Sequence, residues 1–272
     1  MLDAKLATKS HPEHQTIVKL SETVSVGGTE LLIVGGPCTV ESSEQMETVA
    51  SKLSVAPVQA LRGGVYKPRT SPYAFQGMGI EGLEILADVS RRYGLPVVTE
   101  VMLQVGSRNM QNFELLKAIG QAGKPVLLKR GLSATIEEFV MAAEYILSHG
   151  NPDVVLCERG IRSFDNYTRN VLDLGAVVAL KQLTHLPVIV DPSHAAGKRE
   201  LVAPLAKAAV ACGADGLIVE CHPQPEKSVS DARQALSLPD MIDLVASLRP
   251  VAVAVGRLVP EANLPSKVLS VR

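Results

Sequence analysis

The stretch Leu61-Arg62-Gly63-Gly64-Val65-Tyr66-Lys67-Pro68-Arg69-Thr70-Ser71-Pro72 joins the end of an apolar run to a stiff basic loop. The run at 58–61 is typical of a buried strand, and the paired glycines let the backbone approach a ligand closely. Pro68 fixes its own φ and favours an extended residue before it. The loop therefore holds Arg62, Lys67 and Arg69 at a strand end, where cations suit phosphate or carboxylate groups. A solvated basic loop has the same composition.

Similar apolar runs recur along the chain, with helical patterns between them. Near-continuous runs of β-branched residues and leucine are typical of parallel strands that are buried on both faces. The runs lie at residues 31–34, 58–61, 97–101, 103–105, 126–128, 154–156, 188–190 and 217–219. The helical patterns lie at residues 42–53, 80–93, 112–122, 134–148, 167–183 and 199–212. This alternation predicts an α/β fold, a (β/α)8 TIM barrel. A doubly wound sheet is disfavoured because no GxGxxG motif follows the first strand.

The two ends of the chain are expected to lie outside the barrel. Residues 16–20 and 23–26 have the pattern of short strands, and Gly27-Gly28 is a turn signal, so a short β-hairpin is expected before the first barrel strand. The expected division is an N-terminal extension at 1–29, a catalytic barrel at 30–250 and a C-terminal tail at 251–272.

One interval breaks the repeat. The runs at 97–101 and 103–105 are almost contiguous, whereas parallel neighbours need a crossover of about a dozen residues or more. A single strand through both runs would be about 30 Å long, which exceeds a usual barrel strand. We therefore expect the crossover helix between the third and fourth strands to be missing, and residues 97–108 to be the least regular part of the barrel.

Chemically active side chains follow almost every expected strand, and the carboxyl ends of barrel strands are where active sites form. In chain order these ends carry Cys38; Arg62, Lys67 and Arg69; Glu100; Arg108; Lys129 and Arg130; Glu158 and Arg159; Asp191 and His194; and Glu220 and His222. A matching position on so many strands favours a functional site over solvated surface.

Two groups stand out among these residues. The cations Arg62, Lys67, Arg69, Arg108, Lys129 and Arg159 suit two phosphorylated molecules. The set Cys38, His194 and Glu220, with one further carboxylate, suits a divalent transition metal ion such as Mn, Fe, Co or Zn better than Mg or Ca. Taken singly, Cys38 could be a small buried apolar residue and His194 a hydrogen-bonded core histidine.

Composition excludes several classes of protein. The net charge of −1, the absence of Trp and an aromatic content of 3% argue against nucleic acid as a partner. The apolar runs are shorter than the ~18 residues that a membrane span needs. The four cysteines form no CxxC pair, and the N-terminal residues have no apolar signal core, so we expect reduced thiols and a cytoplasmic location.

Several segments together resemble the 3-deoxy-D-arabino-heptulosonate 7-phosphate (DAHP) synthases, in particular the short microbial type Iβ. The resemblance runs from about residue 33 to about residue 248, and Lys67-Pro68-Arg69-Thr70 is its most specific part. The matching segments are Gly35-Gly36-Pro37-Cys38-Thr39-Val40-Glu41-Ser42, residues 61–72, Gly106-Ser107-Arg108-Asn109-Met110-Gln111, Leu127-Leu128-Lys129-Arg130-Gly131, Asp191-Pro192-Ser193-His194 and Glu220-Cys221-His222-Pro223.

The resemblance implies a metal-dependent barrel that condenses phosphoenolpyruvate with erythrose 4-phosphate and releases phosphate, the first step of the shikimate pathway. It implies the metal ligands Cys38, His194, Glu220 and Asp231, phosphoenolpyruvate on Arg62, Lys67, Arg108, Lys129 and Arg159, and the erythrose 4-phosphate phosphate on Arg69 and Thr70. Lys67, Lys129 and His194 are the expected catalytic residues. A homo-oligomer, dimer or tetramer, is also implied.

The sequence departs from the family at the missing crossover, because family members have a helix between the Val-Thr-Glu and Gln-Val-Gly-Ser-Arg segments. Glu100 and Arg108 are therefore not expected to occupy both usual positions without distortion. Two alternatives stay open: a 3-deoxy-D-manno-octulosonate 8-phosphate synthase that uses arabinose 5-phosphate, and an impaired barrel that binds phosphoenolpyruvate or a partner without turnover.

Overall fold

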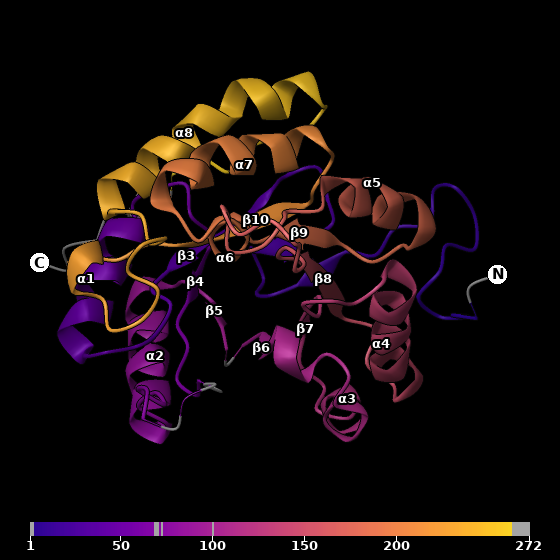
Figure 1. The fold of residues 1–272 in the computed structure, drawn as a ribbon, viewed down its shortest axis with the longest axis horizontal. Coiled ribbons are helices and arrows are strands. Elements are labelled where there is room, and N and C mark those ends of the chain that lie inside the picture. Colours follow the sequence, from indigo (N-terminus) through magenta and orange to yellow (C-terminus); the bar gives the residue numbers. More distant parts are fainter. Residues whose placement is uncertain (1–2, 68–70, 72, 100, 263–272) are drawn as a thin grey trace, which may run out of the picture.

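The structure is a computed structural model that describes residues 3–67, 71, 73–99 and 101–262. Eight parallel strands form one sheet that curves into a nearly closed barrel, as Figure 1 shows. The strands are β3 (Leu32–Gly36), β4 (Ala60–Arg62), β5 (Val97–Val98), β6 (Leu103–Val105), β7 (Val126–Lys129), β8 (Val154–Glu158), β9 (Val188–Val190) and β10 (Gly216–Glu220). Their order in the sheet is β5-β4-β3-β10-β9-β8-β7-β6, so the predicted TIM barrel is confirmed.

Helices surround the sheet. They are α1 (Ser43–Leu53), α2 (Ile80–Tyr93), α3 (Phe113–Gly120), α4 (Ile136–Ser148), α5 (Leu174–Leu183), α6 (Pro192–Ala196), α7 (Arg199–Ala211) and α8 (Leu238–Ala254), with short 3-10 turns η1 (Ser107–Asn109) and η2 (Pro225–Lys227). Helix α5 begins at Leu174, later than the expected residue 167, because Asp173 caps it. Helix α8 passes through residue 250, where the tail was expected to begin. Every helix in the described parts of the chain is too short or too polar to cross a bilayer.

The strands alternate between two buried layers, because successive side chains of a strand point to opposite faces. One layer lies between the sheet and the helices and includes Ile33, Leu61 and Leu128. The other fills the barrel interior and is formed by Leu32, Val34, Ala60, Val98, Met102, Leu127, Val155, Cys157, Ile189 and Ile218. This alternation decides which residues beyond the strand ends point into the mouth of the barrel.

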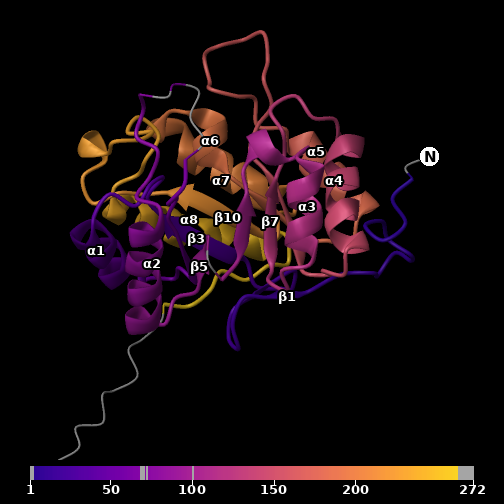
Figure 2. The same ribbon diagram turned by 90° about the horizontal axis from the view of Figure 1, so that it is seen from below.

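A short hairpin closes the amino-terminal end of the barrel. Strands β1 (Val18–Lys19) and β2 (Ser25–Val26) pair in antiparallel fashion, and Val18 and Val26 belong to the same apolar cluster as the barrel interior. Figure 2 shows β1 at the opposite end of the barrel from α6. The hairpin is as expected, but its turn is not: Leu20 and Val24 close it by a backbone hydrogen bond, whereas Gly27-Gly28 follows the hairpin.

The expected missing crossover lies between β5 and β6, which stand at the two ends of the strand order. A tight turn connects them: Val97 O accepts from the backbone N–H groups of Val101 and Met102, and Thr99 has a φ of 152°. Met102 lies beside Val98, so β6 starts beyond the carboxyl end of β5. We call this break the seam. The prediction that residues 97–108 are the least regular part of the barrel is confirmed.

The helix ring has its break at the same place. Helices α2 and α3 lie on either side of the seam in Figure 1, and among the described residues only the 3-10 turn η1 lies between them along the chain, with no α-helix. The structure thus keeps all eight strand positions of the barrel, while the described residues form no α-helix between β5 and β6.

Candidate active site

The alternation within the strands brings charged side chains together at the carboxyl end of the barrel. A residue two positions after an interior side chain points to the same interior. Five charged residues follow interior residues in this way: Arg62 after Ala60, Lys129 after Leu127, Arg159 after Cys157, Asp191 after Ile189, and Glu220 after Ile218. All five are buried, with relative exposures of 5% or less.

Three of these side chains, Arg62, Lys129 and Arg159, line a cavity of about 960 Å³ at the mouth of the barrel. Five of the sequence-predicted substrate-binding residues line it: Arg62, Lys67, Arg108, Lys129 and Arg159. Arg108 reaches the cavity from η1 despite the missing crossover. Arg69, Thr70 and Glu100 lie outside the described residues, so their expected positions stay predictions.

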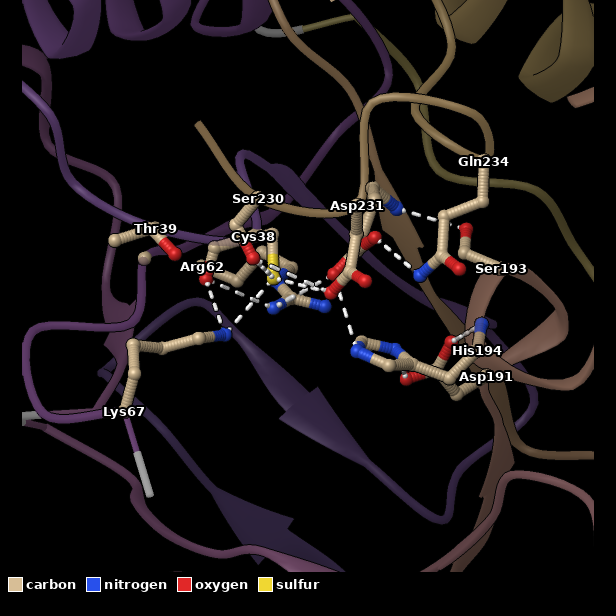
Figure 3. Close-up of polar contacts among 12 residues, drawn as sticks. Cys38, Thr39, Arg62, Lys67, Asp191, Ser193, His194, Ser230, Asp231 and Gln234 are labelled. Carbon is tan, nitrogen blue, oxygen red and sulfur yellow. Dashed lines mark hydrogen bonds and ion pairs between the residues drawn. The ribbon is translucent and has the colours of Figure 1, made fainter. Parts of the chain in front are cut away.

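The four predicted metal ligands converge at one side of this cavity. Cys38, His194, Glu220 and Asp231 each offer a ligand atom, and these atoms all lie within 4.8 Å of one another. They come from four different segments, after β3, in α6, at the end of β10 and in the loop that follows β10 (Figure 3). At this distance the four atoms can contact a common ion.

Asp191 orients His194 and neutralises Lys129. Asp191 Oδ2 lies 2.6 Å from His194 Nδ1 and 2.5 Å from Lys129 Nζ. Burial lowers the pKa of His194, although the Asp191 and Glu220 carboxylates oppose this effect. A neutral imidazole that donates from Nδ1 presents the lone pair of Nε2 to the site, which is the form that binds metals.

Glu220 has polar neighbours at both carboxylate oxygens, but only one of the two accepts a hydrogen bond. Oε2 accepts a hydrogen bond of 2.6 Å from Gln234 Nε2, whereas Oε1 lies 3.2 Å from both Arg62 Nη2 and His194 Nε2. Neither approach to Oε1 has hydrogen-bond geometry, so Oε1 is a buried acceptor without a partner. Burial raises the pKa of Glu220, but His194 and Arg62 outweigh it and the net pKa is lowered. Glu220 is therefore an anion with one unused oxygen.

Cys38 contacts both an anion and a cation. Its Sγ lies 3.0 Å from Asp231 Oδ2 and 2.8 Å from Lys67 Nζ. Burial, reinforced by Glu220, raises the pKa of the Cys38 thiol to about 11. Burial also opposes ionisation of Asp231, but the hydrogen bond from Cys38 and the charge of Arg169 lower its pKa. Cys38 thus keeps its proton at neutral pH, and a metal ion that binds the sulfur would have to replace that proton.

The donor set fits a divalent transition metal ion. A sulfur, an imidazole nitrogen and two carboxylates are the ligands that such ions share, and the unpartnered Glu220 Oε1 is a buried acceptor of the kind that an ion would satisfy. The donors do not distinguish Mn, Fe, Co and Zn from one another.

Two residues of the predicted strand ends point away from the mouth. Arg130 and Glu158 follow the outward side chains, and Arg130 Nη1 lies 2.9 Å from Glu158 Oε2 and 3.0 Å from Asp173 Oδ2. This buried ion pair joins β7 and β8 to the start of α5. It belongs to the barrel wall and not to the cavity.

Sequence reasoning missed four residues at the mouth. Arg162, Arg169 and Asn170 line the cavity from the loop before α5, and Gln234 contacts Glu220 from the loop before α8. Residues 167–173 were expected to be helical, which hid Arg169 and Asn170. A correct reading of Asp173 as a helix cap would have placed both in a loop above the mouth.

Comparison with known proteins assigns the chain to a family. The model of the DAHP synthetase I family matches residues 15–251. The chain is 48% identical over 260 residues to a phospho-2-dehydro-3-deoxyheptonate aldolase of Thermotoga maritima, and the match covers 90% of this chain and 76% of that protein. A 2-dehydro-3-deoxyphosphooctonate aldolase of Stenotrophomonas maltophilia is 32% identical over 250 residues, which cover 80% of this chain and 90% of that one.

Solved structures show the same relationship. A DAHP synthase crystal structure from Thermotoga maritima superposes with a TM-score of 0.90 and 44% identity, and covers 94% of this chain and 79% of that one. A truncated form of the Thermotoga maritima enzyme superposes with a TM-score of 0.85 and 42% identity, and the match covers 93% of this chain and 98% of that one. The matched stretch contains the barrel and all four metal-capable residues. The chain belongs to the DAHP synthetase I family.

Proposed function

We propose that this protein is a metal-dependent DAHP synthase. It condenses phosphoenolpyruvate with erythrose 4-phosphate and water, and it releases DAHP and phosphate. The observation that carries the proposal is the convergence of Cys38, His194, Glu220 and Asp231 within 4.8 Å at the edge of a cavity lined by cations. The names of the Thermotoga relatives support the choice of substrates.

The reaction needs no activated side-chain nucleophile. The enol carbon of phosphoenolpyruvate forms a bond to the aldehyde carbon of the sugar, water adds to the carbon that carries the phosphate oxygen, and that carbon–oxygen bond breaks as phosphate leaves. Cys38, His194, Glu220 and Asp231 would hold a divalent metal ion, which when bound would supply Lewis acidity toward the aldehyde.

The protein's own residues would supply charge and orientation. Arg62, Lys129 and Arg159 are buried cations that can hold the phosphate and carboxylate of phosphoenolpyruvate and offset repulsion between two anionic substrates. Lys67 Nζ, 2.8 Å from Cys38 Sγ, is a proton source beside the place where the aldehyde oxygen would gain negative charge. Erythrose 4-phosphate would place its phosphate on Arg69 and Thr70, and Arg108 would complete the phosphoenolpyruvate site.

An assay of phosphoenolpyruvate consumption tests the proposal. We expect rapid loss with erythrose 4-phosphate after Mn²⁺ is added to metal-stripped protein. We expect much slower loss with arabinose 5-phosphate, the substrate of the octulosonate alternative. Phosphoenolpyruvate binding without turnover under any metal would support the impaired barrel instead.

The Cys38→Ala variant tests the metal ligands. It removes the sulfur donor, so metal-dependent turnover should fall by at least about 100-fold. A variant of Cys212, the partly exposed cysteine at the end of α7, serves as the matched control: Cys212→Ala should retain wild-type activity. Full activity of metal-stripped Cys38→Ala would refute the assignment.

We further propose that the protein is a cytoplasmic homo-oligomer, a dimer or a tetramer. The free state of all four cysteines is compatible with a reducing compartment. Light scattering coupled to size-exclusion chromatography measures the oligomeric state, and a monomer at micromolar concentration would contradict this part of the proposal.

A further inference from the structure

Three of the four metal-capable residues direct one polar atom to the place where the ligand atoms converge. The other polar atom of each contacts a protein partner. His194 Nδ1 is taken by Asp191, at 2.6 Å. Glu220 Oε2 is taken by Gln234 Nε2, also at 2.6 Å, and Asp231 Oδ1 is taken by Arg169 Nη1, at 2.9 Å. Gln234 Nε2 and Arg169 Nη1 donate from outside the group of four ligands, and Figure 3 shows Gln234 on the far side of Asp231 from Cys38.

Arg169 and Gln234 also contact each other, and this contact settles the orientation of the amide. Arg169 Nη1 lies 3.0 Å from Gln234 Oε1, so the amide oxygen accepts from the guanidinium and the amide nitrogen must face Glu220. The reverse orientation would oppose two oxygens on one side and two donors on the other. Gln234 has a relative exposure of 2%, so water does not replace these bonds.

We propose that Gln234 and Arg169 are positioning residues that restrict Glu220 and Asp231 to one oxygen each toward a bound metal ion. The inference rests on the proposed metal-dependent function. An oxygen that already accepts a short hydrogen bond directs one lone pair at the donor, so its rotation toward the ion would weaken that bond and chelation with both oxygens is disfavoured for each carboxylate. The remaining oxygens are fixed before the ion arrives, which raises affinity and leaves ligand positions open for a substrate.

The asymmetry in burial makes the two residues separable by experiment. Gln234 is buried and fixes Glu220 directly, whereas the side chain of Arg169 is 39% exposed and fixes both Asp231 and the Gln234 amide. Loss of Arg169 should therefore affect two ligands, and loss of Gln234 one.

Cobalt titration of metal-stripped protein tests the proposal without an activity readout. Gln234→Met keeps the length of the side chain but donates no hydrogen bond, and Arg169→Met removes the guanidinium. We expect a Kd for Co²⁺ that is 10- to 100-fold higher in each variant, as is usual for partners of metal ligands. The thiolate-to-cobalt charge-transfer band of Cys38 should persist, whereas the d–d bands should weaken as a freed carboxylate oxygen joins the coordination sphere.

A matched control is available on the surface. Gln111 donates from Nε2 to Glu138 Oε1 at 3.3 Å, the same pairing of amide and carboxylate in an exposed place. Gln111→Met should keep the wild-type Kd and spectrum, because its carboxylate partner is no ligand. Thermal unfolding of each variant verifies that the protein is folded, and the Arg169→Met variant carries the test if the buried Gln234→Met variant does not fold.

The outcomes separate this inference from the proposed function. A wild-type Kd and unchanged d–d bands in the folded variants would overturn the positioning role. If Arg169→Met raised only the KM of a phosphorylated substrate, Arg169 would be a substrate cation and the inference would also fail. If the wild-type protein itself gave no thiolate-to-cobalt band, as expected for Cys38→Ala, the metal centre and this inference would fall together.

Discussion

At the residue scale, three cations at the mouth of the barrel pair with carboxylates, and one of them, Arg62, has donors left over. Lys129 lies 2.5 Å from Asp191, and Arg169 lies 2.9 Å from Asp231. Arg62 directs Nη2 toward Glu220, yet its Nε and Nη1 are buried without a partner. Buried donors without partners are rare and costly, so these two indicate a place for an anionic ligand.

Substitution of Arg62 by lysine tests this role. Lysine keeps the charge, but a single nitrogen cannot both face Glu220 and offer two further donors in a plane. With about 1.5–3 kcal/mol for a hydrogen bond to a charged group, kcat/KM for phosphoenolpyruvate should fall roughly 10- to 100-fold. Steady-state kinetics with phosphoenolpyruvate as the varied substrate measures the change.

The control for this substitution lies on the outer surface of α2. The side chain of Arg91 is 77% exposed and pairs loosely with Asp88, at 3.9 Å, so Arg91→Lys should leave kcat/KM unchanged. An Arg62→Lys variant with the wild-type KM for phosphoenolpyruvate would show that the free donors of Arg62 serve another purpose.

Residues of the site could be predicted from the sequence where they follow strands. The two-residue period of a strand carries Arg62, Lys129 and Glu220 from the apolar interior into the mouth, and each run could be recognised by its apolar residues. Arg169 and Gln234 lie in loops, whose path depends on contacts across the whole mouth. No local pattern encodes such a path, so these two residues appeared only in the structure.

At the scale of elements, α4 begins with a reciprocal cap. Thr135 Oγ1 accepts from the backbone N–H of Glu138, and Glu138 Oε2 accepts from the backbone N–H of Thr135 at 2.8 Å. Thr135→Ala should lower the free energy of unfolding by about 1 kcal/mol, which urea denaturation can measure. Thr48→Ala, at a half-buried position within α1, changes no cap and is the comparison.

The charge of Glu138 makes part of this cap depend on pH. The hydrogen bond from the Thr135 backbone lowers the pKa of Glu138 below its ordinary value of 4.5. Its stabilising contribution is therefore present above that value and is lost as the pH falls through the lowered pKa. Glu138→Gln keeps the shape without the charge, so it should destabilise the protein more at pH 7 than in acid, where Glu138 is protonated. Equal destabilisation at both pH values would contradict this explanation.

Helix boundaries could be predicted where a cap is encoded locally. The pattern that was expected to be helical at 42–53 begins with such a cap: Ser42 Oγ accepts from the backbone N–H of Gln45 at 3.0 Å, and the Gln45 side chain accepts from the backbone N–H of Glu41. The short helix α6 was not recognised, because Pro192 and Ser193 after Asp191 also match a turn. Its role in presenting His194 depends on the Asp191 side chain, which accepts from the His194 backbone N–H.

At the scale of the whole molecule, the seam should be the least protected part of the sheet. Strands β3 and β10 pair along both sides, whereas β5 pairs with β4 and β6 with β7, and between β5 and β6 the described residues form only the isolated bridge of Val98 with Met102. Native-state hydrogen exchange should therefore be faster for the amides of β5 and β6 than for those of β3 and β10. Equal protection in all four strands would show that the seam is as stable as the rest.

The barrel could be predicted because its signals are repeated. Each apolar run supports the same alternation, and the short interval at 97–105 was visible as a missing crossover from spacing alone. The position of the hairpin turn was not predictable, since Gly27-Gly28 is the stronger turn signal. Packing decided the turn instead: pairing of Val18 with Val26 places both valines against the barrel interior.

The seam also changes how the two sides of the cavity, one with Arg62 and the other with Arg108, are connected. Arg62 ends β4, and Arg108 lies just after β6. Strand β5 and the seam therefore separate the two residues. In a closed barrel, the hydrogen bonds between adjacent strands would fix the distance between these two residues. Here the continuous pairing of strands between them runs the long way, through β3, β10, β9, β8 and β7. The short way passes through β5 and the turn that follows it, where the described residues form only the isolated bridge of Val98 with Met102. The distance between these two cations can consequently vary with the width of the barrel, and a ligand that contacts both would join the two sides of the seam.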